Sequence, residues 1–178
     1  MIGIIDNGKG ADKISQLVKG KKTVVTPEKA KTLENFSAVI LSDGNIKNEK
    51  ANLKLLETAA GPVLGIGAGA MFIGTAFGST YKEVKPEKQK MLRLVKPGPI
   101  VRDLKKTFKV ACECGYAFNE ITENFGVVAS SPKNEFEILQ DMETPFFCVS
   151  FNPELGFDGI TIIKNFQTFV EVWKKYNK

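Results

Sequence analysis

Short apolar runs alternate with amphipathic segments through the first half of the chain. Four runs rich in Val, Ile and Leu predict buried strands, at residues 2–6, 22–25, 38–42 and 62–66. Residues 10–20 and 48–60 lie between these runs, with Leu, Ile and Val at helical spacing and polar residues on the opposite face. Strands that alternate with helices in this way are typical of a parallel sheet covered by helices.

The second half of the chain changes to short runs punctuated by Pro, Gly, Asn and Ser. Six of them predict strands joined as hairpins, at residues 79–84, 91–96, 108–118, 125–131, 136–140 and 145–151. Residues 159–176 carry apolar side chains at intervals of three and four, with lysines in the last turn, and predict an amphipathic helix. We therefore expect one domain over residues 1–178, an α/β fold whose doubly wound, mostly parallel sheet carries an antiparallel β extension.

The absence of histidine limits the possible chemistry. It excludes Ser-His and Cys-His catalysis and removes the commonest metal ligand. Cys112 and Cys114 are two residues apart, so on a strand they would face the same side, but no third ligand lies near them. The third cysteine, Cys148, makes the count odd, which argues against a disulfide framework. We expect no metal and no cofactor.

The formal net charge of +5 is concentrated in one segment. Residues 82–106 carry nine basic and three acidic side chains. This segment has one aromatic residue, Tyr81, at its margin and no recognition-helix pattern, so we do not expect nucleic acid to bind it. The pattern favours a docking surface for an acidic partner over residues 79–106. The chain shows no signal peptide and no run of about 20 apolar residues, so we expect a cytoplasmic protein without membrane contact.

Residues 61–74, GPVLGIGAGAMFIG, predict a strand, a glycine-rich turn and a helix. Gly65, Gly67 and Ala70 match the dinucleotide-binding pattern, which uses such a turn to bring a pyrophosphate to the backbone. The match lies on the fourth predicted strand, and the acidic residue expected about 20 positions later has only Glu83 and Glu87 as candidates, both in a lysine-rich run. The same turn also fits a nucleophile elbow, with Gly67 at the nucleophile position.

Four motifs together resemble the class I glutamine amidotransferases over essentially the whole chain. Residues 62–78 resemble the family's nucleophile segment, and residues 38–45 resemble the preceding strand and the loop that supplies the oxyanion hole. Residues 149–154, VSFNPE, resemble the segment that carries the catalytic His and Glu, and residues 162–166 resemble the closing helix. With its IIDNG start, the chain looks most like the stand-alone amidotransferase subunit of two-subunit GMP synthetases. This resemblance implies a flavodoxin-like fold.

The departures from the family pattern fall on the chemistry. Gly67 replaces the nucleophilic Cys, and Asn152 replaces the His base, while the orienting carboxylate remains as Glu154. The oxyanion loop reads Asp43-Gly44-Asn45, where a carboxylate opposes a developing negative charge.

Two substrate contacts of the family also differ. Met71 stands where the family has its glutamine-contacting Gln, and Glu113-Cys114 corresponds to the Ser-His segment that helps to hold the glutamine backbone. The resemblance thus implies a pseudoenzyme without glutaminase activity, a binding or regulatory module whose partner is a synthetase-like protein or a second copy of the chain. We expect a remodelled pocket formed by Asp43, Gly44, Gly67, Ala68, Met71, Cys114 and Asn152.

Three alternatives remain open on the sequence alone. One is an enzyme with altered chemistry at the former glutaminase pocket, using Asp43, Glu113, Cys114 or Glu154. Another is an amidotransferase subunit with its nucleophile relocated to Cys114, and the third is nucleotide binding by the glycine turn. Structural roles compete with all of them, since Gly67 suits a sharp turn and Met71 suits a hydrophobic core.

Overall fold

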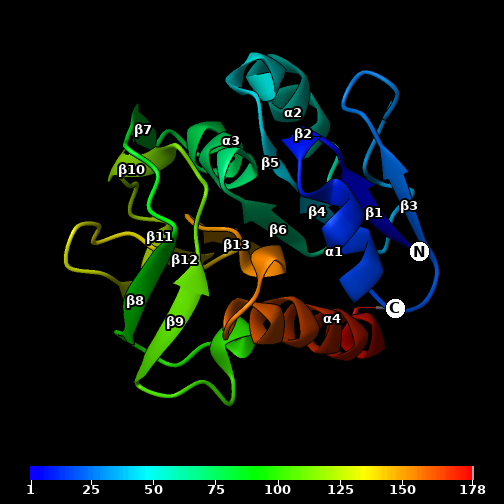
Figure 1. Cartoon of the computed structure of the whole chain (residues 1–178). Helices are drawn as coiled ribbons and strands as arrows, with labels where there is room; N and C mark the ends of the chain where they lie inside the picture. Colours follow the sequence, from blue (N-terminus) through cyan, green and yellow to red (C-terminus); the bar gives the residue numbers. More distant parts are fainter. Residues whose placement is uncertain (178) are drawn as a thin grey trace.

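The computed structural model describes residues 1–177 and contains a large mixed sheet of nine strands (Figure 1). In spatial order the strands are β3 (Lys22–Val25), β1 (Ile2–Ile5), β4 (Ala38–Leu41), β6 (Val63–Ile66), β13 (Phe146–Val149), β12 (Ile138–Asp141), β11 (Phe125–Ser130), β8 (Gln89–Leu94) and β9 (Thr107–Ala111). The first five strands run parallel, and each of the last four is antiparallel to its neighbour. The predicted α/β fold with an antiparallel extension is confirmed.

Strand β13 joins the two parts of the sheet. We expected residues 145–151 in the antiparallel extension, and β13 is antiparallel to β12, but it also pairs in parallel with β6, with Val149 opposite Ile66. The physical reason is its burial, since all four residues of β13 are buried, as is typical of a central parallel strand covered on both faces. The fully apolar sequence of β13 therefore fits the centre of the sheet better than its margin.

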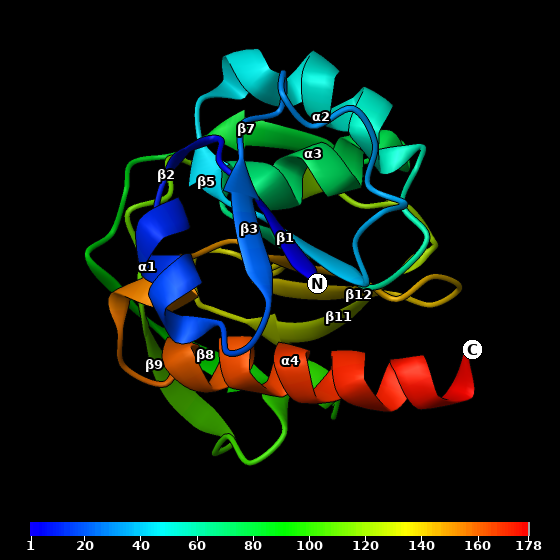
Figure 2. The ribbon, with the colours of Figure 1, turned by 90° about the vertical axis from the view of Figure 1, so that its right-hand side faces the viewer.

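Helices cover both faces of the sheet, so the doubly wound arrangement is confirmed (Figure 2). Helices α1 (Ala11–Leu17) and α4 (Gly159–Tyr176) lie on one face, and α2 (Glu49–Leu56) and α3 (Ala68–Ala76) lie on the other. Each face has its own hydrophobic cluster, one around Ile4 and Phe166 and the other around Leu41 and Ile73. The predicted helix over residues 159–176 has the same bounds as α4.

The predicted strand over residues 108–118 is interrupted. Strand β9 ends at Ala111, and β10 (Tyr116–Glu120) pairs instead with β7 (Thr80–Glu83), as a separate two-stranded ribbon (Figure 1). The backbone turns at residues 112–115, where the N–H of Glu113 donates to the side chain of Asn152 rather than to a sheet neighbour. A second short ribbon pairs β2 (Gly8–Lys9) with β5 (Asp43–Gly44) beside the elbow.

Three short 3-10 helices complete the fold: η1 (Ile46–Asn48), η2 (Pro99–Val101) and η3 (Pro153–Leu155). Among residues 1–177, no helix has both the length and the apolar character needed to cross a membrane.

Candidate functional site

The turn between β6 and α3 has the form of a nucleophile elbow without a nucleophile. Gly67 lies between strand and helix with φ +55° and ψ −118°, a conformation that residues with a side chain rarely adopt. Its N–H donates to the carbonyl oxygen of Val149 at 2.9 Å, which ties the turn to β13. The sequence-based interpretation of this segment as strand, sharp turn and helix is confirmed.

The carboxylate of Asp43 occupies the space in front of Gly67. Its Oδ1 accepts hydrogen bonds from the backbone N–H of Gly44 at 2.9 Å and of Ala68 at 2.8 Å. A Cβ atom placed on Gly67 would lie 2.3 Å from this Oδ1, closer than non-bonded atoms can approach. Asp43 and a side chain at position 67 therefore exclude one another in this geometry.

Asn152 connects the elbow to two neighbouring loops. Its Nδ2 donates to Asp43 Oδ2 at 3.0 Å, and its Oδ1 accepts from the N–H of Glu113 at 2.7 Å. The residue is fully buried, so these contacts are shielded from water. Both ends of the amide are engaged, so Asn152 acts as a structural bridge between Asp43 and the backbone at Glu113.

Glu154 is a buried carboxylate with one unused oxygen. Its Oε1 lies 3.4 Å from the donating Nδ2 of Asn152, whereas Oε2 has no hydrogen-bond partner within residues 1–177. Burial raises the pKa of Glu154 to about 7, and the charge of Asp43 adds to this shift, while the bond from Asn152 opposes it. The residue lines a cavity of about 330 Å³ beside α1. Glu154 is thus able to change protonation near neutral pH.

The structure brings only part of the predicted pocket together. Asp43, Gly44, Gly67, Ala68 and Asn152 form one hydrogen-bonded cluster. Met71 is fully buried in the hydrophobic cluster of the α2–α3 face, where it has no surface to offer a ligand.

Cys114 has the surroundings of an inert thiol. It is buried, and its Sγ lies 3.2 Å from the carbonyl oxygen of Tyr116. Burial raises the pKa of this thiol above its ordinary value, and the nearby Asp43 carboxylate raises it further. Since the thiolate is the nucleophilic form, this environment disfavours a relocated nucleophile.

The glycine turn leaves little room for a nucleotide. A phosphate at this helix would need the N–H of Ala68, which already donates to Asp43. The third glycine of the turn, Gly69, serves packing, because a Cβ there would lie 2.4 Å from the carbonyl oxygen of Leu41. The contacts around the turn therefore oppose the dinucleotide interpretation.

The position of the Asp43 carboxylate was not part of the sequence-based expectation. The sequence indicated an acidic residue in the loop after residues 38–42 but gave no sign that its carboxylate would lie against Gly67. The signal available was the parallel order of β4 and β6, since residues that follow neighbouring parallel strands meet at one edge of the sheet.

Comparison with known proteins identifies the class. Residues 4–168 match the model of the glutamine amidotransferase class-I family, and the chain belongs to this family. Among curated relatives it is similar to a subunit of glutamine-hydrolyzing GMP synthase from Thermoplasma volcanium, with 28% identity over 159 residues, 83% of this chain and 79% of that protein. It also matches the glutamine-hydrolyzing GMP synthase of Wolbachia pipientis wMel, with 26% identity over 76% of this chain and 29% of that protein.

Solved structures agree on the fold. A Thermoplasma acidophilum protein described as a GMP synthase subunit superposes with a TM-score of 0.88 at 20% identity, covering 98% of this chain and 96% of that one. A glutamine amidotransferase of Thermotoga maritima gives a TM-score of 0.68 at 17% identity, covering 98% and 82%. The resemblance inferred from the four sequence motifs is confirmed at the level of the family.

Proposed function

We propose that this chain is an amidotransferase-like protein that does not hydrolyse glutamine and serves as a binding or regulatory module. The observation that carries the proposal is the Asp43 carboxylate seated against Gly67. Covalent glutamine hydrolysis needs a nucleophile, a base and donors for the developing oxyanion. Gly67 supplies no nucleophile, and the Asn152 amide takes no proton at neutral pH. The N–H of Ala68 faces an anion that is already in place.

Ammonia release from glutamine tests this proposal directly. We expect the purified chain to release no ammonia above a blank, both alone and mixed with a cognate synthetase. An authentic glutaminase, measured under the same conditions, is the positive control. Sustained ammonia release that scales with the concentration of this chain would contradict the proposal.

The partner we propose is a synthetase-like protein that docks on the basic segment 79–106. One relative is named as a subunit, and the segment holds nine basic side chains between residues 82 and 106. We expect Lys105→Glu with Lys106→Glu to weaken binding to a cognate synthetase in sedimentation velocity. The matched control is Lys29→Glu with Lys31→Glu, which reverses two exposed charges elsewhere. Equal weakening by both pairs would contradict docking at this segment.

A second candidate function is acid–base chemistry at Glu154. It is favoured by the pKa of about 7 together with the unpartnered Oε2 beside a cavity. A general acid or base works best when its pKa lies near the working pH. The test is a metabolite screen by thermal shift on the wild type and Glu154→Gln. A compound that stabilises only the wild type supports this function, and the lack of any such compound contradicts it.

A further inference from the structure

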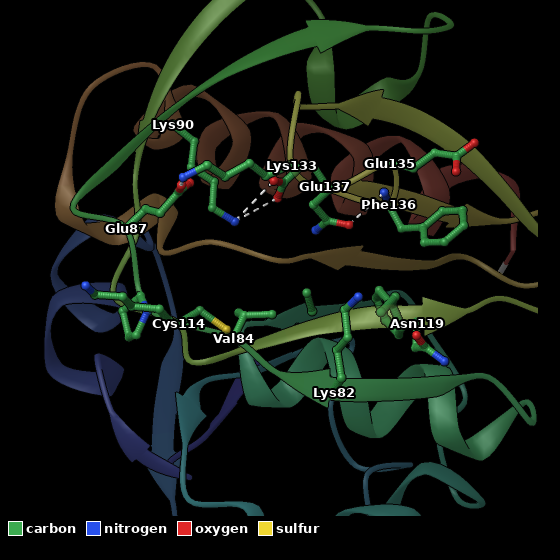
Figure 3. A pocket seen from close by; sticks show the side chains of 15 residues that line it. Lys82, Val84, Glu87, Lys90, Cys114, Asn119, Lys133, Glu135, Phe136 and Glu137 are labelled. Atoms are coloured by element: carbon green, nitrogen blue, oxygen red, sulfur yellow. Dashed lines mark hydrogen bonds and ion pairs between the residues drawn. The ribbon is translucent and has the colours of Figure 1, made fainter.

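A cavity lies away from the elbow, between the β7–β10 ribbon and the antiparallel end of the main sheet (Figure 3). Its volume of about 600 Å³ is in the range of small-molecule sites. One wall is formed by the ribbon and its flanking turns. The other wall is formed by β8 and the loop over residues 131–137. The cavity therefore opens between the ribbon and the antiparallel end of the main sheet.

The ribbon separates this cavity from the elbow. Side chains of β7 alternate between its two faces. The Tyr81 hydroxyl donates to the carboxylate of Glu49 on α2, whereas Lys82 and Val84 line the cavity on the opposite face. Of the residues expected in the remodelled pocket, only Cys114 lines it. The cavity is thus a second location and not an extension of the former glutaminase pocket.

The deepest charges of the cavity neutralise each other. The Lys90 ammonium donates to Glu137 Oε1 at 3.1 Å and Oε2 at 3.2 Å, and to the carbonyl oxygen of Ser150 at 3.2 Å. Both side chains are largely buried, with 9% and 0% exposure. Because an ammonium has three N–H donors, Lys90 has none left for a ligand. This ion pair therefore forms part of the cavity wall and does not itself bind a ligand.

The other charged groups leave an excess of cations. Lys133 pairs with Glu87 at 2.6 Å near the surface. Lys82 and Lys85 also line the cavity and form no salt bridge with any residue of the described chain. The one lining carboxylate without a salt bridge in the described chain is that of Glu135, so two unpaired positive charges face one unpaired negative charge. Figure 3 shows Lys82 rising from the ribbon into the cavity toward the wall that carries Lys90 and Glu137. An anion entering here meets a free ammonium.

Asn134 offers an unused donor from the opposite wall. Its Oδ1 accepts from the N–H of Phe136 at 3.0 Å, which fixes the orientation of the amide. Its Nδ2 is buried, and no atom of residues 1–177 accepts from it. A buried donor without an acceptor is costly, and a ligand oxygen would satisfy it. Apolar surface from Val84, Ala117 and Phe136 surrounds these polar groups.

We propose that this cavity binds a small organic anion, with its carboxylate or phosphate held by the Lys82 ammonium and the Asn134 amide. The apolar body of the ligand lies between Val84 and Ala117 on the ribbon and Phe136 on the facing loop. This site stands whether or not the chain hydrolyses glutamine, because it shares neither Gly67 nor Asp43 with the elbow.

The experiment is a titration of ¹⁵N-labelled protein with phenyl phosphate and with benzoate, followed by NMR. We expect saturable shifts of the Asn134 side-chain NH₂ and of the backbone N–H of Ala117. Tighter binding of phenyl phosphate assigns the site to phosphate esters, and tighter binding of benzoate assigns it to carboxylates. Lys82→Gln should weaken the better probe about tenfold, the value of one charged hydrogen bond.

Two further variants make the test specific. Asn134→Asp keeps an acceptor for Phe136 but replaces the free donor by a negative oxygen, so it should abolish the shift of the Ala117 backbone N–H. Lys88→Gln removes an exposed charge from the same segment without touching the cavity, so it should change affinity less than twofold, on the order expected for an exposed charge. Benzyl alcohol should not bind. Equal weakening by Lys82→Gln and Lys88→Gln, or equal binding of benzyl alcohol, would overturn the proposal.

Discussion

Replacing Glu154 by Gln should remove a pH-dependent loss of stability. In the folded protein this side chain is buried, with 6% exposure, and Oε2 has no hydrogen-bond partner within residues 1–177. The variant keeps the shape of the protonated acid but carries no charge at any pH. The difference between the wild type and the variant therefore measures the free energy that it costs to ionise Glu154 in the folded protein.

The magnitude follows from the pKa of Glu154, which burial raises from 4.5 to about 7. Between these values the folded protein binds more protons than the unfolded chain, so stability falls as the pH rises. The stability that the protonated form of Glu154 contributes to the fold is fully present below pH 4.5 and is lost above the folded-state pKa of about 7. From about pH 5 to about pH 8.5 the loss is about 2.5 kcal/mol.

Urea unfolding followed by fluorescence of Trp173, the only tryptophan, measures this difference. With an m-value of about 2.5 kcal/mol/M, the midpoint of Glu154→Gln should gain about 1 M on the wild type across that pH range. Glu113→Gln is the control, because the Glu113 side chain is 56% exposed and pairs with Lys9 at the surface. Its free energy of unfolding should follow that of the wild type within about 0.5 kcal/mol across the pH range. Parallel pH profiles for the wild type and Glu154→Gln would refute the reasoning.

Three further outcomes follow from the contacts. Gly67→Cys should lower the free energy of unfolding by about 3 kcal/mol or more, through backbone strain and the clash with Asp43. In a urea double-mutant cycle the same substitution should cost less in an Asp43→Gly background. Equal costs in both backgrounds would exclude the clash. Lys90→Met should cost about 3–5 kcal/mol in the same assay, and Glu137→Leu added to it should recover most of the loss. Iodoacetamide should label Cys114 at least about tenfold more slowly in the folded than in the urea-unfolded protein, because burial raises its thiol pKa.

Hydrophobic periodicity was sufficient for the first half of the fold. The runs at residues 2–6 and 38–42 contain β1 and β4, and the segment 10–20 contains α1. These elements pack against their sequence neighbours, so the local pattern carries the information. The antiparallel pairing of residues 145–151 with β12 agrees with the expectation. Their parallel pairing with β6 was not predicted, because β6 lies about 80 positions earlier and local periodicity does not encode pairing at that distance.

The candidate site, like the fold, could be predicted only in part from the sequence. The turn at Gly67 was predictable, since a glycine pattern between an apolar strand and a helix has few geometries. The position of the Asp43 carboxylate could not be predicted, because it depends on how closely the loop after β4 approaches the first turn of α3. The free amide of Asn134 was also out of reach, since a donor is known to lack an acceptor only when every neighbour is placed.

Asp43, Gly67 and Asn152 depend on one another, because the Asp43 carboxylate fits only beside a glycine at position 67 and is held by the Asn152 amide. Any side chain at position 67 would displace the Asp43 carboxylate, which would then lose the N–H of Ala68 and the amide of Asn152. A carboxylate left buried without these donors costs more than the strain of the turn itself. A side chain introduced at position 67 alone is therefore unfavourable while Asp43 remains. When Asp43 is removed first, only the backbone strain of the turn opposes a side chain at position 67.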